Sequence, residues 1–99
     1  MAKRKIVWSR KAELKLFEIL DFYKSRNGNS TYSKKLYKKF IKELLLLNAH
    51  PELGIPTEIE FVRGLIVDDF ILFYEISSET IYVHTLWECR QNPDELKII

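Results

Sequence analysis

A histidine, a glutamate and an arginine near the end of the chain are residue types that could cleave a phosphodiester. His84, Glu88 and Arg90 are separated by even numbers of residues, and side chains spaced in this way share one face of a β-strand. An arginine can neutralise a phosphate oxygen as charge develops on it, while a histidine or a carboxylate can move a proton. The spacing predicts one row, with Tyr82 and Leu86, as a candidate catalytic site. The alternative is that Glu88 and Arg90 are neighbouring solvated charges and that His84 only contributes a hydrogen bond.

Arg63 is a candidate for binding a target, because it lies at the start of a predicted strand. Together with Arg90 it could present two guanidinium groups to the target. The alternative is that Arg63 forms an ordinary ion pair with Glu60 or Glu88. Exposed pairs of that kind contribute only about 0–1 kcal/mol to stability.

Several lysines are predicted to share one face of a helix, and the candidates for target binding among them are Lys35, Lys38, Lys39 and Lys42. Such a face could bind nucleic-acid phosphates, ribosomal RNA or an acidic protein segment. It could also be only a solvated helix face, which is the interpretation we favour. No aromatic residue is interleaved with the lysines, as is usual in proteins that stack single-stranded bases.

The charges are divided along the chain. Residues 1–42 contain 13 Lys or Arg against 3 Asp or Glu, a charge of +10, whereas residues 43–99 contain 3 against 11, a charge of −8. A positive field from the first part can attract phosphates or an acidic protein segment over a long distance.

Length and composition limit the class of protein. The 99 residues, 46% of them apolar, predict one domain (1–99) with one core. The densest apolar run, residues 44–47, is far shorter than a membrane span of about 18 residues, so we expect no membrane partner and a cytoplasmic location. Cys89 is predicted to be a small core residue. His50 and His84 lack a metal-binding motif, and we expect neither metal nor cofactor.

Two helices are predicted near the start of the chain. A short strand, Lys5–Trp8, precedes Ser9, a good helix N-cap. The first helix has a helical repeat of apolar residues, widened by Phe17 and Phe22: Ala12, Leu16, Ile19, Leu20 and Tyr23. Gly28 suits a left-handed helix end, and a second amphipathic helix is expected over residues 31–48. The short loop predicts an antiparallel helical hairpin.

Three strands are predicted to follow: Val62–Val67, Phe70–Ile76 and residues 80–89. Asp68 and Asp69 form the first turn, and Asn92–Pro93 ends the last strand because proline cannot donate to a strand ladder. The predicted class is α+β, in the order strand-helix-helix-strand-strand-strand, with an antiparallel sheet and the hairpin packed on one face. The other face should be free for function.

Four segments carry a family resemblance: IVWSRKAELKLFEILDFY, NAHPELG, VRGLIVDDFILFYEI and HTLWECRQNP. Together, over residues 6–93, they resemble the toxins of type II toxin-antitoxin modules of the RelE/ParE superfamily. The resemblance implies the same order of elements, and a growth-arrest toxin that is neutralised by a cognate antitoxin. In this superfamily, RelE-like members cleave mRNA on the ribosome, whereas ParE-like members inhibit DNA gyrase.

The match to the RNA-cleaving branch is incomplete. Arg90 and Arg63 match positions that are basic in that branch, but Ile71 stands where the ribonucleases carry an arginine. Gly64 and Leu65 supply no lysine, and neither Tyr nor His follows Arg90. The resemblance is therefore nearer to the ParE-like branch.

Three functions remain open at this stage. The first is a ParE-like toxin that binds and inhibits a target such as DNA gyrase, and we favour this over an enzyme. The second is a ribosome-dependent mRNA endoribonuclease, in which Arg90 stabilises the phosphate and His84 or Glu88 moves a proton. The third is a degenerate toxin with only antitoxin-binding or regulatory activity.

Overall fold

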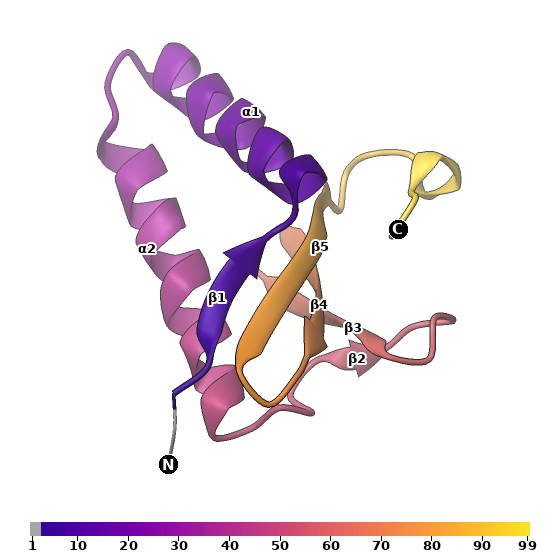
Figure 1. Cartoon of the computed structure of the whole chain (residues 1–99). Coiled ribbons are helices and arrows are strands. Elements are labelled where there is room, and N and C mark those ends of the chain that lie inside the picture. The colour runs from indigo at the N-terminus through magenta and orange to yellow at the C-terminus, as the bar shows by residue number, and fades with distance from the viewer. Residues whose placement is uncertain (1–2) are drawn as a thin grey trace.

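The computed structural model describes residues 3–99 as a helical hairpin packed on a five-stranded sheet (Figure 1). The elements are β1 (Lys5–Trp8), α1 (Arg10–Asn27), α2 (Thr31–Leu45), β2 (Ile55–Pro56), β3 (Val62–Val67), β4 (Phe70–Ile76) and β5 (Thr80–Glu88). Short 3₁₀ helices lie at Leu46–Asn48 and Pro93–Glu95. The predicted α+β class and order of elements are confirmed, with the two-residue β2 as an addition.

The sheet has the order β1-β5-β4-β3-β2. The neighbours from β2 to β5 are antiparallel, as predicted, but β1 pairs with β5 in parallel, so the sheet is mixed. In chain order, α1 and α2 come between β1 and the later strands. In the sheet, β1 is nevertheless the neighbour of β5, the last strand of the chain. Nothing in the composition of Lys5–Trp8 indicates the direction of this pairing.

The predicted helix ends agree with the structure at α1. The Ser9 hydroxyl accepts a hydrogen bond from the Ala12 amide at 3.0 Å, and Gly28 ends the helix with φ 74°. The second helix ends at Leu45, and residues 46–48 tighten into the 3₁₀ turn instead of continuing it. Phe17 and Phe22 do not widen the buried face of α1 as predicted, because they are 59% and 55% exposed.

The main core lies between the hairpin and one face of the sheet. Its fully buried side chains include Leu36, Phe40 and Leu44 from α2. Phe40 meets Phe70 of β4 edge-to-face, with ring centroids 5.5 Å apart. Burial of this apolar surface holds the hairpin on the sheet.

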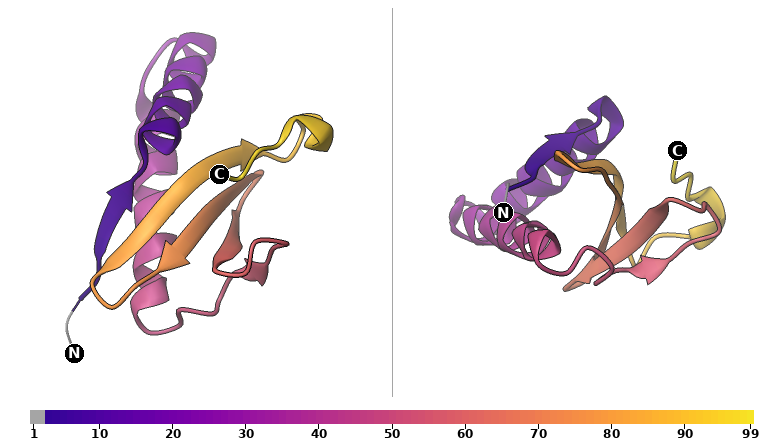
Figure 2. Two further views of the ribbon diagram at one scale, coloured as in Figure 1. Left: turned by 45° about the vertical axis from the view of Figure 1, so that its right-hand side comes forward. Right: turned by 60° about the horizontal axis from the view of Figure 1, so that its bottom comes forward.

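The opposite face of the sheet was predicted to be free, and this is wrong for part of it. Val62, Phe73 and Trp87 form a second buried cluster there. Residues packed against it include Leu96 and Ile98 of the C-terminal segment (residues 91–99). Figure 2 shows this segment and the two helices on opposite sides of the sheet. The apolar side chains of this segment cover part of the sheet face that the helices leave exposed to solvent.

The connection between α2 and β2 is held by one phenol. The Tyr74 hydroxyl accepts a hydrogen bond from the Gly54 amide at 2.9 Å and donates one to the Pro51 carbonyl at 3.0 Å. Gly54 lies so close that an added Cβ would be 2.6 Å from the Tyr74 ring. Burial raises the pKa of Tyr74.

Tyr74→Phe should destabilise the protein by about 1–3 kcal/mol at pH 7, because the buried Gly54 amide and the partly buried Pro51 carbonyl lose their partner. A raised native pKa means that the phenol stabilises the fold below its ordinary pKa of about 10, and that this contribution is lost as the pH rises through the native value. Urea unfolding of both proteins from pH 7 to pH 11 should therefore show a gap that narrows with pH. A gap that widens with pH would contradict this account.

Candidate functional site

A β-bulge at His84 divides the predicted catalytic row. Phe73 of β4 pairs with Thr85 and Tyr74 pairs with Val83, so His84 is an extra residue in β5. An extra residue resets the alternation of side chains along a strand. Val83 accordingly belongs to the core under the helices, whereas Trp87 belongs to the cluster on the other face. The prediction of a single row from Tyr82 to Arg90 is therefore wrong.

His84 is paired with a residue that the sequence did not single out. Its Nε2 atom lies 3.0 Å from Oε1 of Glu75, and its ring lies 4.8 Å from that of Tyr82. The His84 side chain is only 15% exposed. Glu75 pairs with Tyr82 across β4 and β5, and only the register of the two strands could have identified it.

Glu88 lies on the helix side of the sheet. It lines a surface hollow with Leu86 and with residues of α1, among them Glu18 and Tyr23. His84 and Glu88 are therefore on opposite faces of β5, so they cannot share one proton-transfer site.

Arg90 lies at the rim beyond β5, with its side chain 61% exposed. Its Nε donates to Oε1 of Glu88 at 2.8 Å, and Nη2 donates to the phenolic oxygen of Tyr23 at 3.1 Å. The hydrogen bond with Glu88 raises the pKa of Arg90. Arg90 also borders a polar hollow of about 350 Å³, lined by Tyr23, Arg26, Asn27, Tyr32, Asp69 and Arg90.

Arg63 and Arg90 do not form a pair. Arg63 is next to Tyr74 in the sheet, whereas Glu88, two residues before Arg90, pairs with Phe70 at the other end of β4. Nη1 of Arg63 donates to the Gly54 carbonyl at 2.9 Å. Arg63 therefore holds the loop before β2, and neither of the ion pairs considered from the sequence, with Glu60 or Glu88, is present.

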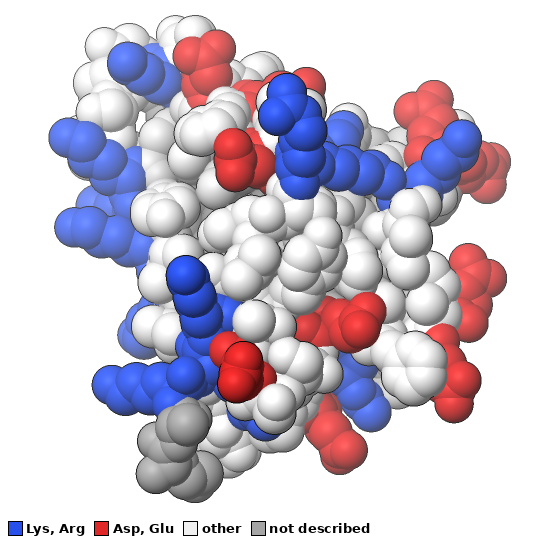
Figure 3. Space-filling view, viewed as in Figure 1, with Lys and Arg blue, Asp and Glu red and all other residues white. Residues whose placement is uncertain are grey.

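The candidate lysines lie along α2, and basic side chains follow this helix on the left of Figure 3. Lys35, Lys38 and Lys42 are exposed. Lys39 forms an ion pair with Asp68 in the turn between β3 and β4, with Nζ 2.6 Å from the carboxylate. The hydrogen bond to Asp68 raises the pKa of Lys39.

An apolar groove runs between α1 and α2. Two hollows of about 510 and 250 Å³ share Leu20 and Ser33, and the Ser33 hydroxyl donates to the Leu20 carbonyl at 2.6 Å. We call this the hairpin groove, and its lining residues are Phe17, Glu18, Leu20, Asp21, Lys24, Ser33, Lys34, Tyr37 and Lys38. Phe17 was predicted to widen the buried face of the first helix, but it lines this groove instead. The available signal was that Phe17 lies next to Leu16 and outside the strict helical repeat.

The prediction that Cys89 is a core residue is wrong, because the strand ends at Glu88 and Cys89 is exposed. Among residues 3–99, no three His, Cys, Asp or Glu side chains are grouped to hold a metal ion. None of the helices in the same range is long and apolar enough to cross a membrane.

A helical hairpin on a five-stranded mixed sheet, with polar side chains at the strand ends, defines a toxin fold of the RelE/ParE type. The family model described as "ParE toxin of type II toxin-antitoxin system, parDE" matches residues 6–93. The chain belongs to this ParE toxin family, as its resemblance predicted.

The solved structures that are similar to this chain include the following two. One, a chain of the chromosomal ParDE toxin-antitoxin system from P. aeruginosa, shares 22% identity. The match covers 87% of this chain and 96% of that one, with a TM-score of 0.71. The other, YafQ from E. coli strain BL21(DE3), shares 14% identity over 86% of this chain and 92% of its own, with a TM-score of 0.49. Comparison with curated proteins finds no match.

Arg90→Ala should leave the urea midpoint of unfolding within experimental error of the wild type, because the arginine is largely exposed and its ion pair is solvated. Leu86→Ala, four residues earlier and fully buried, should cost about 2–5 kcal/mol in the same measurement. A large loss of stability in Arg90→Ala would mean that the contact with Tyr23 is a structural one.

Proposed function

We propose that this protein is a ParE-like growth-arrest toxin that binds and inhibits a protein target such as DNA gyrase, and that a cognate antitoxin neutralises it. The observation that carries the proposal is the β-bulge at His84. It separates His84 from Glu88, while Arg90 is bound to Glu88 and Tyr23. A general acid or base must lie within hydrogen-bond reach of the proton that it moves. These residues do not converge on one reacting phosphate.

The chemistry of the sheet face away from the helices supports the same choice. The register places Ile66, Ile71 and Phe73 on this face, and no lysine or arginine of β3 or β4 joins them. A site that cleaves RNA needs cations where phosphate charge develops. Ile66 is the exposed one of the three, at 55%, and an exposed apolar side chain is suited instead to contact with a protein.

The hairpin groove supports an antitoxin as the partner. Its apolar lining residues are Leu20, Phe17 and Tyr37. Its charged lining residues are the lysines Lys24, Lys34 and Lys38 and the carboxylates Glu18 and Asp21. An amphipathic segment places apolar anchors into a groove of this kind, and acidic residues beside the anchors would meet the lysines. The lysine face of α2 then has a role in steering the antitoxin, without any need for RNA.

The purified protein should inhibit DNA supercoiling by gyrase and should leave mRNA intact on stalled ribosomes. Arg90→Ala should also leave the message intact, so mapping of 5′ ends should give the same pattern for both proteins and for a buffer control. Cleavage at the decoding site that disappears in Arg90→Ala would replace this proposal with the ribosome-dependent endoribonuclease. Expression without antitoxin that does not slow growth would favour a degenerate toxin.

Tyr37→Ala should weaken binding of the antitoxin encoded beside the toxin by tenfold or more, because an aromatic anchor is lost from the hairpin groove. Leu14→Ala is a matched control, since Leu14 is an exposed apolar residue of the same hairpin outside the groove. Titration calorimetry at two salt concentrations measures both variants. Equal affinities for Tyr37→Ala and the wild type would exclude the groove as the antitoxin site.

A further inference from the structure

A second group of exposed apolar side chains lies at the β2 edge of the sheet. Four large side chains on and beside β2 and β3 are about half exposed or more: Leu53 (48%), Ile55 (57%), Phe61 (70%) and Ile66 (55%). We call this surface the edge patch. Ile55 pairs with Gly64, which shares a sheet face with Ile66. The side chains of Ile71 and Phe73 cover Gly64, because a Cβ added there would lie 3.0 Å from Ile71 and 3.4 Å from Phe73.

Phe61 is held in its exposed position by an ordered loop. The Thr57 hydroxyl donates to the Val62 carbonyl at 2.8 Å and accepts from the Ile59 amide at 3.1 Å. The Val62 amide donates to the Ile59 carbonyl at 3.0 Å, and Ile59 packs against the buried cluster of Val62, Phe73 and Trp87. An exposed aromatic ring on a fixed loop loses little conformational entropy when it binds.

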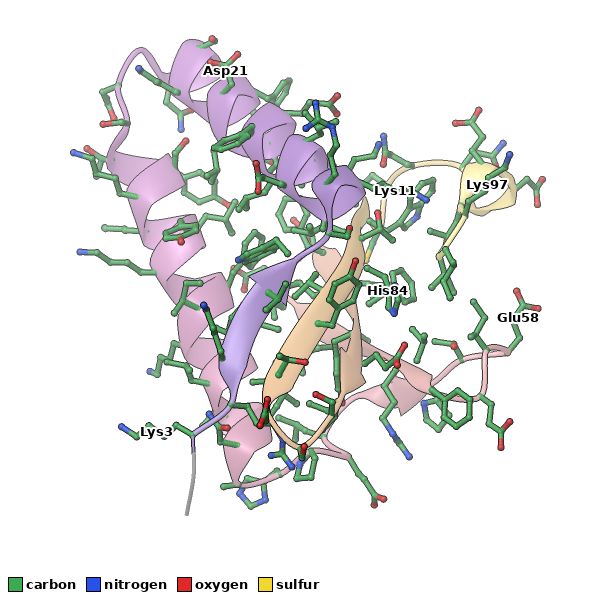
Figure 4. All side chains as sticks on the ribbon, in the orientation of Figure 1. Lys3, Lys11, Asp21, Glu58, His84 and Lys97 are labelled. Atoms are coloured by element: carbon green, nitrogen blue, oxygen red, sulfur yellow. The ribbon has the colours of Figure 1, made fainter. Side chains whose placement is uncertain are left out.

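The edge patch has an acidic surround. Glu52, Glu58 and Glu60 are all exposed beside it, and the guanidinium of Arg63 is turned to the Gly54 carbonyl. Figure 4 labels Glu58 at the right of the molecule, and Figure 3 shows acidic side chains on that side, opposite the basic side chains of α2. The edge patch therefore has acidic neighbours, whereas the hairpin groove has charges of both signs, with Glu18 and Asp21 on α1 and lysines that include Lys34 and Lys38 on α2.

We propose that the edge patch is the surface by which the toxin grips its protein target, and that the target presents an apolar pocket flanked by lysines or arginines. This inference rests on the proposed function and adds the chemistry of the partner. Charge complementarity selects a basic segment for the edge patch, whereas the exposed lysines of α2 attract an acidic one.

The target docks through side chains, with Phe61 as the central anchor. Addition of a strand is disfavoured at this edge, because β2 has only two residues and Pro56 has no amide proton to donate. A large aromatic residue at the centre of a contact is typical of the few positions that dominate binding energy.

Phe61→Ala tests the proposal, with Phe22→Ala as a matched control because Phe22 is an exposed phenylalanine of α1. Phe61→Ala should lose gyrase inhibition and growth arrest by tenfold or more and should bind the antitoxin with unchanged affinity. Phe22→Ala should retain the wild-type potency. The double variant Glu58→Lys, Glu60→Lys should also lose potency, more so at low salt.

The outcomes separate this inference from the proposed function. If the wild type arrests growth and Phe61→Ala does so equally well, the edge patch is not the target surface, although the protein remains a toxin. If the wild type arrests growth but leaves gyrase active, the choice of gyrase is wrong, and growth arrest still tests the patch. If Phe61→Ala changes only the oligomeric state in sedimentation, the patch binds a second copy and the inference is overturned.

Discussion

The hydrogen bonds of Ser9 join the three elements on which the rest of the structure depends. The Ser9 amide donates to the Val83 carbonyl at 3.0 Å, which continues the parallel pairing of β1 with β5. The Ser9 hydroxyl donates to the His84 carbonyl at 2.7 Å and accepts from the Ala12 amide. The Ser9 side chain therefore caps the start of α1 and also attaches this helix to β5 at His84, the residue of the bulge. The position of the hairpin and the irregularity of β5 are linked at this residue.

The bulge decides what the polar residues of β5 can do. Without it, His84, Glu88 and Arg90 would point to one side of the sheet. With it, His84 turns to Glu75 on one face, and Glu88 turns to Arg90 and α1 on the other. Residue types that would suit phosphodiester chemistry are thus used in two separate pairs of side chains, and the exposed apolar side chains remain the features best suited to bind a partner.

Local signals in the sequence predicted the elements, and long-range pairing decided the details that they missed. Ser9, Gly28 and the Asp68–Asp69 turn have local chemistry that specifies a helix start, a helix end and a tight turn. The parallel pairing of β1, the extra residue at His84 and the partner Glu75 depend on register between distant strands. Counting alternate residues along one strand cannot detect a bulge. The prediction of a single catalytic row was therefore wrong, although the strand itself was predicted correctly.

The division of charge along the chain becomes a division in space because both helices pack on the same face of the sheet. The first 42 residues, with a charge of +10, build β1 and most of the hairpin, and the remainder, with −8, builds the other strands and the C-terminal segment. If helices covered both faces of the sheet, the two groups of charges would be interleaved and would largely cancel beyond a Debye length of about 8–10 Å. Here they remain apart, so each face can attract a partner of opposite charge before contact. This separation of charge is what the two proposals use, in which an acidic antitoxin segment meets the lysines of α2 and a basic target segment meets the edge patch.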